Sequence, residues 1–152
     1  MKLNRIPLDQ LPPVERKLIE HACAATERAY APYSRFNVGA AILLVDQSIV
    51  TGSNFENISY GLSLCAETVA VANLNSMGKL SQMLQIAIAC DGLLAGQDEV
   101  EIAPCGRCRQ VLAEATLVTK RDIEVLMLTG DMAAVRRTML SKLLPLPFSP
   151  KG

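Results

Sequence analysis

Three cysteines occupy positions from which their sulfur atoms can reach one metal ion. Cys105 and Cys108 form a C-x-x-C pair at the expected start of a helix, where residues three apart point to the same side. Cys65 opens another expected helix and supplies a third thiolate. Three protein ligands with a fourth position free are typical of catalytic zinc. We therefore expect one Zn²⁺ per chain, with a water or hydroxide bound in that fourth position.

A glutamate accompanies these ligands. Glu67 follows Cys65 by two residues and shares its first helical turn. From there a carboxylate can lie beside the metal, take a proton from water and return it to a substrate. A first-turn Glu is also favoured by the helix dipole alone. Next to three thiolates we interpret Glu67 as the general acid and base.

Two other interpretations of the cysteines stay open. A C-x-x-C pair is also typical of a redox dithiol. A structural zinc module that binds a partner would need a fourth ligand, for which His21, Cys23 and Cys90 are the candidates. We interpret Cys23 and Cys90 as buried small hydrophobic residues and His21 as a half-buried packing residue.

The charge of the zinc site needs compensation, because zinc bound by three thiolates is net negative and attracts water less strongly. The N-termini of both helices can stabilise thiolates through their backbone N–H groups. Arg107 or Arg109 can add positive charge or hydrogen bonds to sulfur, and we expect at least one of them near the cluster. The alternative is a solvated helix arginine, which applies more to Arg107 than to Arg109.

Hydrophobic periodicity and turn residues predict the elements that must hold these side chains. The expected helices cover residues 13–30, 65–77 and 105–115, followed by a short last helix capped by Thr138 and ending before Pro145. The expected strands cover residues 37–45, 49–52, 84–90, 123–128 and 134–137; residues 53–64 are expected to form a functional loop and residues 91–103 a connection. Strands interleaved with helices predict an α/β fold, a three-layer α/β/α sandwich with a mixed, roughly five-stranded sheet.

Composition limits the class of protein. Half of the 152 residues are apolar, which fits a single domain over residues 1–152. The formal net charge is zero, so we expect a small substrate and no nucleic acid polymer, because proteins that hold such polymers usually carry a basic surface. With no signal peptide or membrane-spanning run, we expect a cytoplasmic protein without a membrane partner.

Four sequence blocks resemble the short cytidine deaminases, and the resemblance covers nearly the whole chain. The blocks are AYAPYSRFNVGAA at 29–41, NFEN at 54–57, CAE at 65–67 and PCGRCRQ at 104–110. The tail LLPLPF at 143–148 is similar to that family's C-terminal segment. The resemblance implies zinc-dependent hydrolytic deamination of cytidine and deoxycytidine in pyrimidine salvage, with release of ammonia.

The resemblance also implies roles for individual residues. Asn54 and Glu56 would bind the ribose, and Phe36 would pack on the pyrimidine ring. Phe148 would pack over the base, often in a neighbouring subunit's site. In the mechanism that we expect, the Ala66 backbone N–H helps to orient the base. The family forms homotetramers, with a Tyr at the position of Tyr60 in an interface.

Two positions depart from the family pattern. Most members with three cysteine ligands carry Arg where this chain has Thr68, so compensation of the thiolate charge falls on other groups. Arg107 stands at a usually small position, and the PCGRCRQ run resembles blasticidin S deaminase. Blasticidin S, free cytosine and a base in RNA are therefore alternative substrates, although Glu56 argues against a free base and the zero net charge against RNA.

Overall fold

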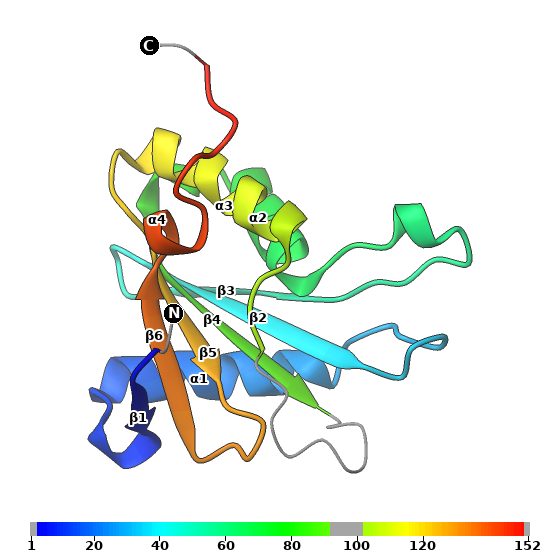
Figure 1. The fold of residues 1–152 in the computed structure, drawn as a ribbon, viewed down its shortest axis with the longest axis horizontal. Helices are drawn as coiled ribbons and strands as arrows, with labels where there is room; N and C mark the ends of the chain where they lie inside the picture. The colour runs from blue at the N-terminus through cyan, green and yellow to red at the C-terminus, as the bar shows by residue number, and fades with distance from the viewer. Residues whose placement is uncertain (1–2, 92–101, 151–152) are drawn as a thin grey trace.

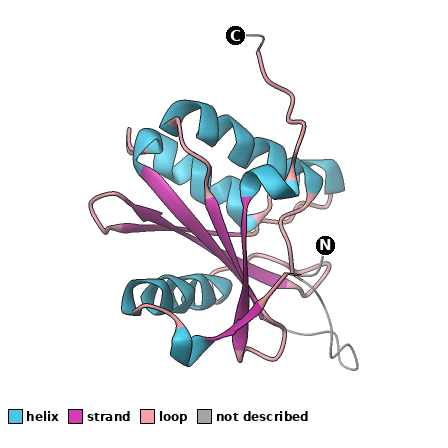
Figure 2. Cartoon of the chain, turned by 60° about the vertical axis from the view of Figure 1, so that its left-hand side comes forward, coloured by secondary structure: helices cyan, strands magenta, loops and turns pink. Residues whose placement is uncertain are grey.

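The computed structural model describes residues 3–91 and 102–150, and in these ranges one mixed sheet of six strands lies between helices (Figures 1 and 2). The strands are β1 (Arg5–Pro7), β2 (Asn37–Leu44), β3 (Ile49–Ser53), β4 (Met83–Asp91), β5 (Glu124–Leu128) and β6 (Ala134–Met139). Their order is β1-β6-β5-β4-β2-β3, and only the β4–β5 pair among these neighbours is parallel.

Helices cover both faces of the sheet. They are α1 (Pro13–Thr26), α2 (Ala66–Ser76), α3 (Gly106–Thr119) and the short α4 (Leu140–Leu143). Figure 1 shows α1 along one face and α2 with α3 along the other, which confirms the expected three-layer α/β/α sandwich. None of the helices in the described part of the chain is long and apolar enough to span a membrane.

Two apolar cores, one on each face of the sheet, explain why the strands are apolar throughout. Alternate residues of β2 point to opposite faces, so that Ala40 and Ile42 pack in the core with α2 and α3, whereas Ala41 and Leu43 pack in the core with α1. A strand covered on both faces needs apolar side chains at every position. This is the pattern from which the buried strand was predicted.

Two glycines set how closely the helices approach the sheet. A Cβ at Gly52 would lie 2.3 Å from the backbone N of Ala70 and 2.6 Å from the carbonyl O of Ala66. A Cβ at Gly39 would lie 2.1 Å from the carbonyl O of Ala22 in α1. Glycine at position 52 therefore lets β3 touch the first turns of α2 and fixes where that helix begins.

The ends of the helices differ from the sequence prediction. The first helix ends at Thr26 and not at residue 30, because the backbone of Tyr30 pairs with the loop after β3: its N–H donates to Asn54 O at 3.0 Å, and Glu56 N–H donates to Tyr30 O at 2.8 Å. The third helix runs on to Thr119 and ends at Lys120, which adopts a left-handed φ of 56°.

The last helix is not capped by Thr138, which lies in β6 with its hydroxyl buried. Met139 occupies the N-cap position instead, and Asp122 accepts the N–H of Ser141 at 3.1 Å. The connection expected over residues 91–103 lies largely outside the described residues.

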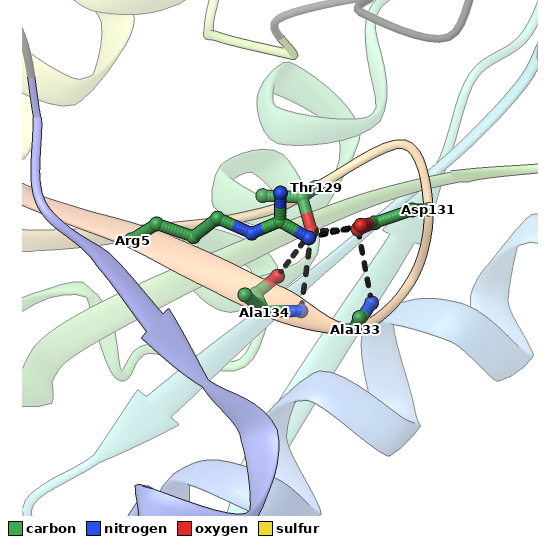
Figure 3. Close-up of polar contacts among 5 residues, drawn as sticks. All are labelled: Arg5, Thr129, Asp131, Ala133 and Ala134. Carbon is green, nitrogen blue, oxygen red and sulfur yellow. Dashed lines mark hydrogen bonds and ion pairs between the residues drawn. The ribbon is translucent and has the colours of Figure 1, made fainter.

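Strand β1 makes the sheet six-stranded, one strand more than expected. The guanidinium of Arg5, the first residue of β1, forms an ion pair with Asp131 in the turn between β5 and β6 (Figure 3). The Thr129 hydroxyl donates to Asp131 at 2.6 Å and accepts the N–H of Ala134 at 3.1 Å, while Ala133 N–H donates to Asp131 at 3.2 Å. Led by the Thr129 hydrogen bond, these contacts lower the pKa of Asp131 to about 2. A three-residue edge strand ending in Pro has no periodicity from which it could be predicted.

Candidate active site

The sulfur atoms of Cys65, Cys105 and Cys108 all lie within 4.8 Å of one another. Those of Cys65 and Cys105 are 3.8 Å apart. A tetrahedral zinc ion with Zn–S bonds of about 2.3 Å separates its sulfur ligands by roughly 3.8 Å, so this donor set fits zinc. Cys65 is the N-cap of α2 and Cys105 is the N-cap of α3, which brings the positive ends of both helix dipoles to the cluster.

The candidates for a fourth ligand lie elsewhere. His21 and Cys23 belong to α1, on the opposite face of the sheet, and Cys23 and Cys90 line a separate cavity. His21 is exposed rather than half-buried, so its interpretation as a packing residue is wrong. Among the described residues the three cysteines form the one group of three or more metal-ligating side chains. A closed structural zinc site is therefore not supported.

Glu67 lies in the first turn of α2, beside the sulfur atoms, and is only 4% exposed to solvent. Burial raises its pKa to about 6, and the nearby Cys65 thiolate acts in the same direction. A carboxyl group whose pKa lies near neutral pH can both accept and donate a proton under the same conditions. This is the property that the predicted role requires.

The two arginines make different contacts. Arg107 donates from Nη1 to Ser63 O at 3.2 Å, and its charge helps to lower the pKa of Cys65, after the larger effect of hydrogen bonding with Cys108. Arg109 donates from Nε to Pro104 O at 2.8 Å and from Nη1 to Leu143 O at 3.1 Å. Arg109 thus ties α3 to the C-terminal segment, whereas Arg107 lies close enough to influence the cluster.

Thr68 supplies a further group at the cluster. Its Oγ1 lies 3.6 Å from Sγ of the fully buried Cys108. A hydroxyl that donates to a metal-bound thiolate reduces its negative charge, and loss of such a partner typically lowers metal affinity about 10-fold or more. We expect Thr68→Val to weaken zinc binding by about 10-fold, measured by competition with a chelator. Thr68→Ser keeps the hydroxyl and serves as the control; equal affinity in the Val variant would contradict this role.

A cavity of about 410 Å³ opens beside the cysteines. It brings together five residues predicted to bind or transform the substrate, and its lining comprises Ser34, Phe36, Val38, Asn54, Glu56, Ser63, Leu64, Cys65, Ala66, Glu67, Ile88, Ile102, Ala103 and Cys105. The volume lies in the usual range for small-molecule sites. The tail residue Phe148 and the loop residue Tyr60 are not part of the lining; they are 88% and 76% exposed.

The two polar residues predicted to bind the ribose are already oriented by the protein. Asn54 accepts the N–H of Val38 at 2.8 Å and donates to Phe36 O at 2.9 Å. Glu56 accepts the Ser34 hydroxyl and the backbone N–H groups of Tyr33 and Ser34, and these bonds, led by the hydroxyl, lower its pKa, so it is a carboxylate at neutral pH. After these bonds Asn54 keeps one donor and one acceptor position, and Glu56, which also accepts the Ser34 hydroxyl, keeps one acceptor position.

Sequence reasoning did not identify several residues of the cavity. Ser63 and Ile88 line it, yet neither belongs to a metal-ligand or acid–base pattern. Ser34 lies in a quoted sequence block but was given no role. The apolar pattern of the strand predicts that Ile88 is buried, but it does not show which face of the sheet borders a cavity. Ser63 lies in the polar loop predicted over residues 53–64, and this position was the one feature of the sequence that could have indicated its place in the site.

A cavity lined by two of the three clustered cysteines and by the adjacent Glu67 holds the groups that a hydrolytic zinc enzyme uses. The family profile described as the cytidine and deoxycytidylate deaminase zinc-binding region matches residues 13–121. The chain is 41% identical over 134 residues to a cytidine deaminase of Halalkalibacterium halodurans, and the aligned region covers 87% of this chain and 92% of that protein. It is 49% identical over 105 residues to a cytidine deaminase of Mycobacterium tuberculosis, covering 68% and 74% of the two chains.

A solved structure shares the fold as well. The cytidine deaminase of Burkholderia pseudomallei superimposes with a TM-score of 0.72 at 41% identity, covering 87% of this chain and 97% of that one. The chain therefore belongs to the cytidine and deoxycytidylate deaminase family. It is an enzyme of the hydrolytic deaminase class, and its three cysteines form a cluster that can hold the metal ion of this zinc-binding family.

Proposed function

We propose that this enzyme deaminates cytidine and deoxycytidine to uridine and deoxyuridine. One observation carries the proposal: a single cavity is lined by the catalytic candidates Glu67, Cys65 and Cys105 and by the sugar-binding candidates Asn54 and Glu56. A free base has no sugar to use the hydrogen-bonding capacity that Asn54 and Glu56 keep toward the cavity. The named relatives in three bacteria are cytidine deaminases, which supports the same substrate.

The residues divide the reaction among them. Cys65, Cys105 and Cys108 would hold zinc, which supplies a Lewis acid that lowers the pKa of water. Glu67 takes a proton from the attacking water and delivers it to N3 of the cytosine as oxygen adds at C4. Glu67 then passes the second proton to the amino group, which leaves as ammonia. Phe36 packs on the ring, the Ala66 N–H orients it, and Asn54 and Glu56 hold the sugar so that the attack is effectively unimolecular.

The cavity favours a nucleoside over a nucleotide. None of the described residues that line it is Lys or Arg, the side chains that usually recognise phosphate. The Glu56 carboxylate would in addition repel a phosphate at the sugar. Both features support cytidine and deoxycytidine rather than deoxycytidylate.

Ammonia release tests the substrate. We expect turnover of cytidine and deoxycytidine, and at least about 100-fold lower kcat/KM for deoxycytidylate, free cytosine and blasticidin S, because each lacks the sugar or adds charge at it. Zinc is quantified in the same sample. Failure to deaminate either nucleoside, or preference for blasticidin S, would overturn the proposed substrate.

The wider proposal is one catalytic domain over residues 1–152 that works in the cytoplasm as a homotetramer. Free thiols at the metal site suit a reducing compartment. The loop between β3 and α2 projects from the sheet (Figure 1) and carries exposed Ile58, Tyr60 and Leu62, which a second copy would cover. Gln110 holds the backbone of Phe148 through hydrogen bonds of 2.8 and 3.0 Å, and the Phe148 side chain is exposed. In the tetramer this side chain would reach the cavity of a neighbouring subunit.

A further inference from the structure

Ser34 links two substrate-binding candidates through one hydroxyl group. Its Oγ donates a hydrogen bond to Oε1 of Glu56 and accepts the backbone N–H of Phe36 at 3.1 Å. The same residue lines the main cavity and a neighbouring outer cavity formed with Tyr33 and Tyr60. Ser34 therefore lies where the two cavities share a wall, bonded to the Glu56 carboxylate and to the Phe36 backbone.

The turn around Ser34 is held in one conformation by several contacts. The backbone N–H groups of Tyr33 and Ser34 donate to Oε2 of Glu56 at 2.9 and 3.2 Å. Arg35 adopts a left-handed φ of 56°, which is strained for a residue with a Cβ, and its N–H donates to Ala31 O at 2.9 Å. A strained turn persists only where its surroundings fix it, and here they include Glu56 itself.

We propose that Ser34 is a positioning residue for sugar recognition, whose hydroxyl holds the Glu56 carboxylate in its binding geometry. The inference rests on the proposed function. Without the hydroxyl, Oε1 of Glu56 loses its donor and the Phe36 N–H loses its acceptor, while both backbone donors to Oε2 remain. Glu56 then turns more freely, and the sugar must order it on binding. Among the described residues Ser34 makes no hydrogen bond to Glu67 or to the cysteines, so the chemical step is expected to be unaffected.

The test separates binding from chemistry in Ser34→Ala. We expect KM for cytidine to rise about 10-fold, as for loss of one hydrogen bond to a charged group, with kcat within about twofold. Ser34→Thr retains the hydroxyl and should restore most of the affinity. Ser76→Ala, which removes a serine hydroxyl bonded to Ala72 O far from the cavity, is the matched control and should behave as wild type. Zinc content and thermal unfolding show that each variant is folded.

A double-mutant cycle identifies the partner. In a Glu56→Ala background, Ser34→Ala should change KM less than about twofold, because the carboxylate that it positions is gone. The sugar-free substrate 1-methylcytosine should also be insensitive to Ser34→Ala. An unchanged KM in an active enzyme, equal losses for cytidine and 1-methylcytosine, or full additivity with Glu56→Ala would each overturn the role of Ser34. A wild-type enzyme that deaminates no nucleoside would overturn the proposed function and this inference with it.

Discussion

Replacing Glu67 with Gln is expected to lower kcat for cytidine by about 10³- to 10⁴-fold while zinc stays near one per chain. The amide is nearly isosteric with the carboxylate, so the cavity and the cysteine cluster keep their shape. It cannot take a proton from water or return one to N3, and both proton transfers of the reaction therefore lose their carrier. Ammonia release and metal analysis on the same protein measure the two effects.

The matched control is Glu114→Gln, an exposed glutamate of α3. It should retain full activity. The free energy of unfolding should not fall in Glu67→Gln, because a buried carboxyl group with a raised pKa is replaced by a neutral one. Full activity in Glu67→Gln would remove it from the mechanism, and loss of zinc would show that it supports the metal site rather than proton transfer.

The metal ligands and the acid–base residue were predictable because they lie in two short segments of the sequence, CAE at 65–67 and PCGRC at 104–108. Cys105 and Cys108 are three residues apart at the start of α3, and Glu67 lies two residues after Cys65 at the start of α2, so local geometry places each pair. That the two pairs meet followed from the donor set of a zinc site and not from spacing. The three-layer fold followed from apolar strands between amphipathic helices. These parts depend on local spacing, which a sequence displays directly.

The contacts that the sequence could not reveal join distant segments. Thr68 meets Cys108 across 40 residues, and Ser34 meets Glu56 across 22. The early end of α1 likewise depends on Tyr30 pairing with the loop after β3. These contacts are fixed by how α1, β3, α2 and α3 pack, which is tertiary information with no counterpart in propensity or period.

Removal of one zinc ligand is expected to have the other large effect. Cys108→Ala should reduce bound zinc from one per chain to less than about 0.1 and abolish ammonia release, because two remaining thiolates hold zinc far more weakly than three. Cys108 is fully buried, and among the described residues no fourth Cys, His, Asp or Glu joins this group of metal-ligating side chains to take its place. The unfolding temperature of the variant should no longer rise when zinc is added, since a ligand stabilises only the state that binds it.

Cys23→Ala is the matched control, because this thiol lines a different cavity on the α1 side of the sheet. It should keep both zinc and activity. Chelator and reductant treatment of the wild-type enzyme decides between metal and redox chemistry at the C-x-x-C pair, because loss of Cys108 would disable either. A redox dithiol would retain its function without zinc and respond to reductant, whereas a zinc enzyme loses activity to a chelator and regains it with added metal. Activity of Cys108→Ala without bound metal would therefore exclude the zinc mechanism, and loss of zinc in Cys23→Ala would move the metal site away from the cavity.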